Sequence, residues 1–465
     1  LNFDFGSIND FLSPFFPAGF YYKTFMWPTK FWRKYEYFIR KAAGLGKSPT
    51  SDDPDKYEHF HYHCDVLVVG AGISGLVATL LAASANLKVL LIEQEPTLGG
   101  ESNLTKDTTG KSQHTKIILN QIEKFNNVKI INNTSVFAYM HFNYLLACQK
   151  INNSNIRQII WKIRAKKVVL ATGSIERFLT FDNNDRPGII LSNSARKYLN
   201  FYNANPGKKI IIFTNNDQAY QTAIDFKMAN IEVEGIIDVR KNSNGDLVKE
   251  AQKLGIKIFF KQAVTDTSGR KKINSVNVNK IDEECKKIIG KSKKISCDLL
   301  CVSGGWTPNV NLFSQSRGNL IYRELDGTFI PDKSFQDQIS IGACNGTFEY
   351  NEIIEETFSK VSKLLNNLGK KNRVNIDQFL KTEKLFYDKI KHIWIVPSNK
   401  HFGKTKMFVD FQNDVTAKDI KLALKEGYKS IEHVKRYTTT GMATDQGKIS
   451  NINALGIIST LSGLP

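Results

Sequence analysis

Three glycines spaced as Gly70-x-Gly72-x-x-Gly75 constrain the fold of this chain more than any other feature. They follow an apolar segment typical of a buried strand, Asp65-Val-Leu-Val-Val69, and they open an alanine- and leucine-rich segment that predicts a helix to about Asn86. A second strand is expected over Lys88–Ile92, and Glu93 ends it, 23 residues after Gly70. This arrangement predicts a βαβ unit that binds a dinucleotide.

Each residue of this glycine fingerprint has a physical role. Gly70 permits a tight turn, Gly72 lets the backbone approach a pyrophosphate, and Gly75 lets the helix pack close to the strand. Glu93 is expected to accept hydrogen bonds from an adenosine ribose, and a free carboxylate at that position disfavours a 2′-phosphate. The sequence therefore favours NAD or FAD over NADP.

Two further segments add to the predicted site: Leu98-Gly99-Gly100-Glu101, and Ala171-Thr172-Gly173 at the end of a later strand, Lys167–Ala171. An early glycine fingerprint with a distant Ala-Thr-Gly resembles the flavoprotein disulfide-reductase type of two-dinucleotide fold. In such proteins the last strand usually ends in Gly-Asp, and the aspartate holds the ribityl chain of the flavin. Here that pair is Gly342-Ala343, which departs from a standard flavin site.

A second βαβ pattern is nested in the chain, with strands over Lys208–Phe213 and Val233–Val239 and a helix from about Asp217 to Ala229. Its turn, Thr214-Asn-Asn-Asp-Gln-Ala219, contains no glycine. We therefore expect a nucleotide in the first unit and none in the second.

Charge and composition narrow the class of protein. The 465 residues carry 64 Lys plus Arg against 45 Asp plus Glu, a formal charge of +19. This charge is spread along the chain without an aromatic-rich recognition module, which favours a compositional bias over a nucleic-acid surface. The alternative that this charge forms a docking surface for an acidic partner subunit is not excluded.

No apolar run approaches the length of a membrane span. Six cysteines without a Cys-x-x-Cys pair, and no secretory leader, predict free thiols in a cytoplasmic protein.

Other candidate sites are weak. His59, His61 and His63 alternate along a predicted strand, but no Cys, Asp or Glu is spaced to complete a metal site, so a structural or solvent-facing role is favoured. No Ser-His-Asp or Cys-His constellation is supported by spacing. We therefore expect neither a bound metal nor a catalytic residue in this chain.

These patterns predict an α/β, FAD/NAD(P)-binding Rossmann-like two-dinucleotide fold with a small helical C-terminal domain. In that tail, Val415–Gly427 is typical of a helix with Thr416 as its N-cap and Gly427 beyond its C-terminus. The expected divisions are an aromatic arm and linker (residues 1–60), the first part of the dinucleotide-binding domain (61–175), a nested degenerate second unit (176–300), the closing part (301–375) and the helical tail (376–465).

Four segments carry a more specific resemblance, and they are Phe20–Pro28, Asn183–Gly188, Val302–Pro308 and the tail from Phe408–Thr416 through Val434–Lys448. They are similar to alpha subunits of heterotetrameric sarcosine oxidases. The resemblance implies a larger subunit, in which a ubiquitin-like domain precedes and a folate-binding aminomethyltransferase-like domain follows the nucleotide-binding part, so that residues 1–465 are its middle. No cysteine follows Cys344, which excludes an iron–sulfur cluster in the tail.

In that family, sarcosine is oxidised to glycine at an FAD of the beta subunit, and the one-carbon unit passes to tetrahydrofolate. Electrons pass to an FMN between alpha and beta subunits and then to oxygen, which gives hydrogen peroxide, while the alpha subunit holds an NAD that takes no part in turnover. The resemblance implies beta, gamma and delta partner subunits and an amine-oxidising site on the beta subunit. The resemblance, together with the glycine patterns, implies that NAD, or FAD as the alternative, lies against Gly70, Gly72, Ser74, Gly75, Glu93, Gln94, Gly100, Glu101, Val136, Thr172, Gly173, Gly342, Ala343 and Phe348.

Two other functions stay open from sequence. One is an autonomous FAD-dependent amine or opine dehydrogenase, and the other is a non-catalytic nucleotide-binding scaffold. The first would be a yellow protein that reduces a dye with sarcosine or an opine.

Overall fold

The computed structural model describes residues 8–12, 15, 27–42, 44, 46–105, 111–151, 155–380 and 384–463. Most of the predicted aromatic arm before residue 27 lies outside the described residues. Internal contacts divide the chain into two compact units. The larger one comprises residues 55–179 and 186–397, and the smaller one comprises residues 1–54, 180–185 and 398–465.

The first sheet of the larger unit has seven strands in the order β3-β2-β1-β6-β5-β4, with β19 also paired to β6. Strands β3, β2, β1, β6 and β19 are parallel, whereas β4 and β5 form an antiparallel extension. The strands are β1 (Lys56–Val69), β2 (Val89–Ile92), β3 (Val128–Ile131), β4 (Thr134–Met140), β5 (Tyr144–Lys150), β6 (Ile156–Leu170) and β19 (Gln338–Ser340).

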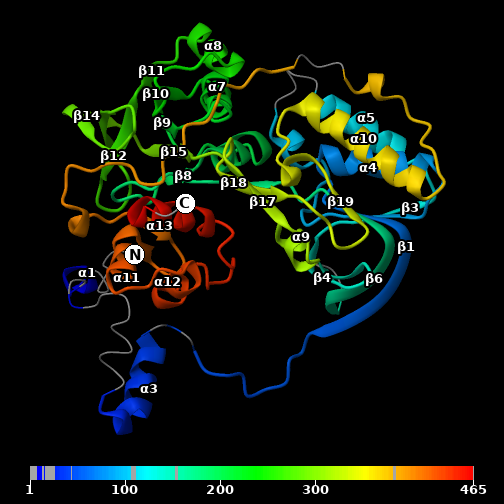
Figure 1. The fold of residues 1–465 in the computed structure, drawn as a ribbon, viewed down its shortest axis with the longest axis horizontal. Helices are drawn as coiled ribbons and strands as arrows, with labels where there is room; N and C mark the ends of the chain where they lie inside the picture. Colours follow the sequence, from blue (N-terminus) through cyan, green and yellow to red (C-terminus); the bar gives the residue numbers. More distant parts are fainter. Residues whose placement is uncertain are drawn as a thin grey trace. The chain divides into compact units, whose positions relative to one another are not determined.

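Three helices form one layer on this sheet: α4 (Ile73–Ser84), α5 (Lys111–Ile122) and α10 (Tyr350–Asn367), which lie side by side (Figure 1). Nearly every residue of α4 is buried, because α5 and α10 cover the sides that the sheet does not. The apolar runs of β1 and β2 are buried on both faces, as expected of inner parallel strands. The glycine turn is therefore held between a fixed strand and a fixed helix.

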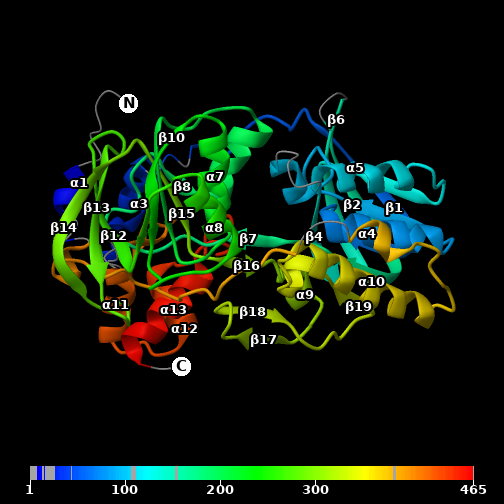
Figure 2. The same cartoon turned by 90° about the horizontal axis from the view of Figure 1, so that it is seen from above.

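The second sheet of the larger unit has five parallel strands in the order β11-β10-β9-β15-β8, and α7 and α8 pack on it (Figure 2). This confirms the nested second unit of the two-dinucleotide fold. Its elements are β8 (Ile189–Leu191), α6 (Ser192–Arg196), β9 (Lys209–Thr214), α7 (Tyr220–Met228), β10 (Glu232–Asp238), α8 (Asp246–Lys253), β11 (Ile258–Phe260) and β15 (Leu299–Ser303). The predicted helix begins three residues later than expected, since residues 215–219 form a hydrogen-bonded turn.

Smaller elements complete the larger unit. A three-stranded antiparallel sheet follows β11, and the unit also contains two short antiparallel ribbons. They comprise β12 (Gln262–Ser268), β13 (Ser275–Ile281), β14 (Ile288–Ser296), β7 (Ser174–Glu176), β16 (Trp306–Pro308), β17 (Leu320–Arg323), β18 (Thr328–Pro331), α9 (Asn311–Gln315), the π-helical turn η6 (Lys197–Phe201) and the 3₁₀ turns η4 (Gly100–Leu104), η7 (Gly342–Asn345) and η8 (Ile376–Gln378).

The cysteines of this chain are free thiols. All six cysteines are unpaired, and five of them are buried. Burial raises the pKa of Cys64 and of Cys297 to about 12, so both thiols stay protonated at neutral pH.

Among the described residues, no helix is long and apolar enough to cross a membrane.

The smaller unit is mainly helical. It contains α1 (Ile8–Leu12), η3 (Thr29–Phe31), α3 (Trp32–Ala42), η9 (Phe402–Lys404), β20 (Phe408–Asp410), β21 (Val415–Thr416), α11 (Ala417–Lys425), α12 (Ile431–Thr438) and α13 (Asn451–Ser462). The predicted N-cap of α11 is confirmed. The Asp419 carboxylate accepts the Thr416 backbone N–H at 2.9 Å and its hydroxyl at 2.6 Å.

We expect Asp419→Ala to lower the free energy of unfolding of the smaller unit by about 1 kcal/mol, the usual cost of losing a helix cap. Urea denaturation followed by circular dichroism measures this change. Lys425→Ala, at an exposed position in the last turn of the same helix, is the matched control and should have a clearly smaller effect, because it removes only an exposed charge near the helix C-terminus. Equal effects of the two substitutions would contradict the capping role.

Candidate functional site

The glycine turn lies where β1 passes into α4. Gly70 has a φ of +100°, and a Cβ there would overlap the Ala171 carbonyl oxygen. A Cβ at Gly75 would overlap the Gly70 carbonyl oxygen. Both positions are therefore restricted to glycine by packing of the chain on itself.

Gly72 differs from these two glycines. It is the N-cap of α4 in an extended conformation, and a Cβ built there has no heavy atom within 4 Å. Folding alone does not require glycine at this position. The open space lies at the N-terminus of a helix, where backbone N–H groups and the helix dipole favour an anion. The residues present therefore fit the pyrophosphate of a dinucleotide.

Glu93 anchors the turn to the end of β2. This residue is 7% exposed, and its carboxylate accepts the Ala71 N–H at 2.6 Å and the Glu95 N–H at 2.9 Å. A carboxylate has about four lone-pair sites, so both bonds leave capacity for a ribose hydroxyl. Sequence reasoning expected the ribose contact and missed the bracing of the turn, although an acid at the end of the second strand was the available signal.

Part of the predicted segment Leu98-Gly99-Gly100-Glu101 lies against the turn. Gly99 donates its N–H to the Ala71 carbonyl at 2.8 Å, and a Cβ at Gly100 would lie 3.0 Å from the Gly72 Cα. The side chain of Glu101 is 62% exposed and lies 3.5 Å from Arg196. The structure thus brings Gly99 and Gly100 to the turn and leaves Glu101 at its margin.

The remaining predicted residues fall on two sides of the turn. On the β6 side, the Thr172 hydroxyl donates to the Asn309 carbonyl, and a Cβ at Gly342 would lie 2.7 Å from the Ser74 hydroxyl oxygen. Gly173 follows Thr172 with a φ of +70°. Gly342 and Ala343 lie in η7 rather than in the expected strand, which ends at Ser340. Phe348 is half-buried shortly before α10.

On the β2 side, Gln94 is exposed next to Glu93. Val136 lies on β4, whose first residue, Thr134, donates its N–H to the Glu93 carbonyl at 2.8 Å. The start of β4 therefore borders the end of β2, the adenosine side of the predicted site.

A carboxylate missed by sequence reasoning caps α10. Glu349 is 6% exposed and accepts the Glu352 N–H at 3.0 Å. The positive end of this helix is thus already partly neutralised by the chain's own acid. The Glu349-x-x-Glu352 spacing ahead of an apolar-periodic segment was a usable signal for this cap.

Three buried ionisable side chains lie nearby in the same unit, and they are Glu176, Arg196 and Asp225. The Glu176 carboxylate accepts the Asn193 N–H at 2.7 Å, and burial raises the pKa of Glu176 to about 8, although that hydrogen bond lowers it. Arg196 donates to Asp225 at 2.8 Å. Glu176 is therefore largely protonated at neutral pH.

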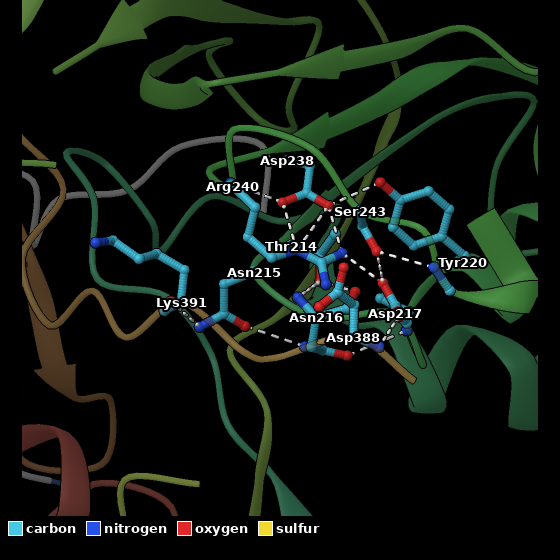
Figure 3. Close-up of polar contacts among 12 residues, drawn as sticks. Thr214, Asn215, Asn216, Asp217, Tyr220, Asp238, Arg240, Ser243, Asp388 and Lys391 are labelled. Carbon is cyan, nitrogen blue, oxygen red and sulfur yellow. Dashed lines mark hydrogen bonds and ion pairs between the residues drawn. The ribbon is translucent and has the colours of Figure 1, made fainter. Parts of the chain in front are cut away.

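The turn of the second unit is filled by a polar network (Figure 3). Arg240 lies 2.7 Å from a carboxylate oxygen of Asp217 and 2.7 Å from one of Asp238. Tyr220 donates its hydroxyl to Asp238 at 2.7 Å, and Ser243 donates to Asp217 at 2.8 Å. All five residues are buried. The sequence prediction that no nucleotide binds here rested only on the missing glycine.

The exposed histidines of β1, His59, His61 and His63, lie outside any such cluster. Within the residues that the structure describes, no group of three or more His, Cys, Asp or Glu side chains is placed to hold a metal ion.

Two family models match the chain. Residues 64–336 match the pyridine nucleotide-disulphide oxidoreductase model, and residues 404–464 match the sarcosine oxidase A3 domain. The first match covers more than half of the chain, so the chain belongs to the pyridine nucleotide-disulphide oxidoreductase family, whose members bind dinucleotides of the FAD or NAD type.

Individual relatives give a more specific resemblance than the family model does. The chain is 35% identical over 482 residues to sarcosine oxidase subunit alpha of Rhizobium meliloti (strain 1021), and 32% identical over 441 residues to that of Corynebacterium sp. (strain P-1). These alignments cover 100% and 90% of this chain, but 46% and 45% of the relatives. The resemblance to sarcosine oxidase alpha subunits is confirmed, and the chain spans about half the length of these relatives.

The fold is also shared with a solved structure. L-proline dehydrogenase from P. horikoshii superposes with a TM-score of 0.63 at 20% identity, over 90% of this chain and 77% of that one. This similarity supports the two-dinucleotide fold.

We expect Gly72→Val to abolish dinucleotide binding, because the valine side chain would occupy the space proposed for the pyrophosphate. The nucleotide-free fold should change little, because no heavy atom of the chain lies within 4 Å of a Cβ at this position. Thermal shift with and without nucleotide measures both effects. At roughly 100 times Kd, bound ligand should stabilise the wild-type chain by about 2.7 kcal/mol and the variant not at all. Gly75→Ala is the contrasting variant and should destabilise even the nucleotide-free chain. Normal ligand stabilisation of Gly72→Val would refute this site.

Glu176 should make stability depend on pH. Because its folded pKa of about 8 lies above the unfolded value near 4.5, the folded state holds the proton more tightly. Its contribution is complete below about pH 4.5 and is lost as the pH rises toward 8. We expect Glu176→Gln to lose less thermal stability between pH 5 and pH 9 than the wild-type chain. Glu123→Gln, at an exposed position, should follow the wild type; parallel curves for all three chains would contradict the prediction.

Proposed function

We propose that this chain is the nucleotide-binding part of the alpha subunit of a heterotetrameric sarcosine oxidase. The observation that carries the proposal is the open space at Gly72 in a chain 35% identical to such a subunit along its whole length. In this proposal the enzyme demethylates sarcosine to glycine, passes the one-carbon unit to tetrahydrofolate and reduces oxygen to hydrogen peroxide. The amine-oxidising site lies on a partner subunit, and the chain works in the cytoplasm.

The proposed ligand of the first unit is NAD. Its pyrophosphate would lie against Gly72 and the first turn of α4, and its adenosine ribose against Glu93. Because β2 and β6 flank β1 on opposite sides, the second half of the dinucleotide would extend toward Thr172, Gly173 and Ala343. A bound nicotinamide can accept a hydride, but here the dinucleotide acts as a fixed structural ligand.

Two features support NAD over FAD. Ala343 stands where a flavin site usually supplies an aspartate for the ribityl hydroxyls. In addition, the Glu349 carboxylate occupies the N-terminal end of α10, so an electron-rich group placed there would meet a negative charge instead of free N–H groups.

The partners in this proposal are the beta, gamma and delta subunits, with FAD and FMN mainly on the beta subunit. Tetrahydrofolate would bind to a domain other than the one described. The chain's own contribution is to hold a dinucleotide and to dock its partners.

Heat release of bound nucleotide from the purified chain, followed by mass spectrometry, tests the ligand. We expect one NAD per chain and no FAD, because Ala343 and Glu349 remove two features that favour a flavin. Recovery of stoichiometric FAD without NAD would overturn the NAD assignment and favour the amine or opine dehydrogenase alternative.

A further inference from the structure

The pairing of the strands allows the two βαβ units to be compared. In the first unit, Val69 pairs with Ile92, which places Gly70 beside Glu93, 23 residues later. In the second unit, β10 holds one extra residue at a bulge, so that Thr214 pairs with Asp238, 24 residues later. In both units the two strands are parallel neighbours with the helix packed on them. Position by position, the two turns can therefore be compared.

This comparison gives the residues of the second turn their counterparts. By this register, Thr214, Asn216 and Ala219 stand at the positions of Gly70, Gly72 and Gly75. Asp238 stands at the position of Glu93, the predicted partner of the ribose. The second unit thus keeps the acid at the end of its second strand and has no glycine at the three turn positions, and Asp217 directly follows the position of Gly72.

Arg240 joins these two positions. Its guanidinium contacts Asp217 and Asp238 at 2.7 Å each (Figure 3). In the first unit, the equivalent of Asp238 is the residue that the ribose would contact, and Asp217 directly follows the equivalent of Gly72, which the pyrophosphate would contact. The side chains of Asp217 and Asp238 are 0% exposed and that of Arg240 is 5% exposed. The chain therefore places its own cation between two carboxylates at the point where the fold usually binds a ligand.

Residues 385–391, which we call the strap, are hydrogen-bonded to the same turn. Asp388 donates its N–H to Asp217 at 2.6 Å, Lys391 donates its N–H to the Asn215 carbonyl at 3.2 Å, and the Asn215 amide donates to the Lys391 carbonyl at 2.9 Å. Two hydrogen bonds also join Phe386 to Asp246. Leu385 and Tyr387 pack on the apolar core of this unit. The strap thus runs across the end of β9 and is held at both ends.

A dinucleotide could enter only by breaking this arrangement. Its pyrophosphate would meet the Asp217 carboxylate, and Arg240 is already neutralised by two buried acids. We propose that the second nucleotide crevice is an internal brace, in which Arg240 and the strap replace the ligand. The chain therefore holds one dinucleotide and accepts no hydride from free NADH or NADPH through its second unit. This inference is independent of whether the first unit holds NAD or FAD.

Nucleotide binding to the full Gly72→Val chain tests the proposal, because this substitution blocks the first site. The probes are NADH, NADPH and ADP-ribose, titrated to millimolar concentration by isothermal calorimetry. We expect no saturable binding by the variant, whereas the nucleotide-free wild-type chain should bind one dinucleotide. Saturable binding of about one equivalent by Gly72→Val would overturn the brace. Failure of the wild-type chain to bind would count against the proposed function alone.

A second variant tests the role of Arg240. Arg240→Met leaves two buried carboxylates without their cation, so we expect its melting temperature to fall by several degrees. Lys241→Met removes the adjacent cation, which makes an exposed ion pair with Glu283, and should not change the melting temperature. An unchanged melting temperature for Arg240→Met would contradict the bracing role, and the titration above decides the proposal even if this variant does not fold.

Discussion

The close contact of α4 with the ends of β1 and β6 is the constraint on which the first unit depends. Gly75 lies against the Gly70 carbonyl, and Gly70 lies against the Ala171 carbonyl, so neither position can carry a Cβ. This packing directs the N-terminus of α4 across the end of the sheet. Glu93 then fixes the turn through the Ala71 N–H. The space at Gly72 is a consequence of these contacts, and no other part of the described chain fills it.

The two βαβ units show how one backbone plan reaches opposite outcomes. In the first unit, the space at Gly72 lies at the start of a helix, and the acid at the end of the second strand retains hydrogen-bonding capacity. In the second unit, Asp217 and Asp238 are both engaged by Arg240, and the strap supplies further donors. Membership of the pyridine nucleotide-disulphide oxidoreductase family therefore describes the fold of both units. The two turns differ in their side chains: the first leaves space at Gly72, whereas Asp217 and Arg240 occupy the second.

Local patterns in the sequence predicted much of this architecture. The glycine fingerprint, the apolar strands and the Thr416 cap depend on residues close together in the chain, and the structure has them at the expected places. The absence of glycine from the second turn could also be read from the sequence. The network of Asp217, Asp238 and Arg240 at this turn could not. Asp388 reaches Asp217 across 171 residues of sequence, and no short-range pattern encodes such a contact. The capping of α10 by Glu349 was encoded locally and was missed. The domain boundaries and the residues that touch a dinucleotide stay predictions.

An experimental structure of the purified, ligand-replete chain would test the central claim most directly. We expect density for one dinucleotide, with its pyrophosphate against Gly72 at the N-terminus of α4, and an Arg240 guanidinium between Asp217 and Asp238 beneath an ordered strap. A dinucleotide bound at Asp217, or a first unit in which Gly72 contacts no ligand, would contradict it.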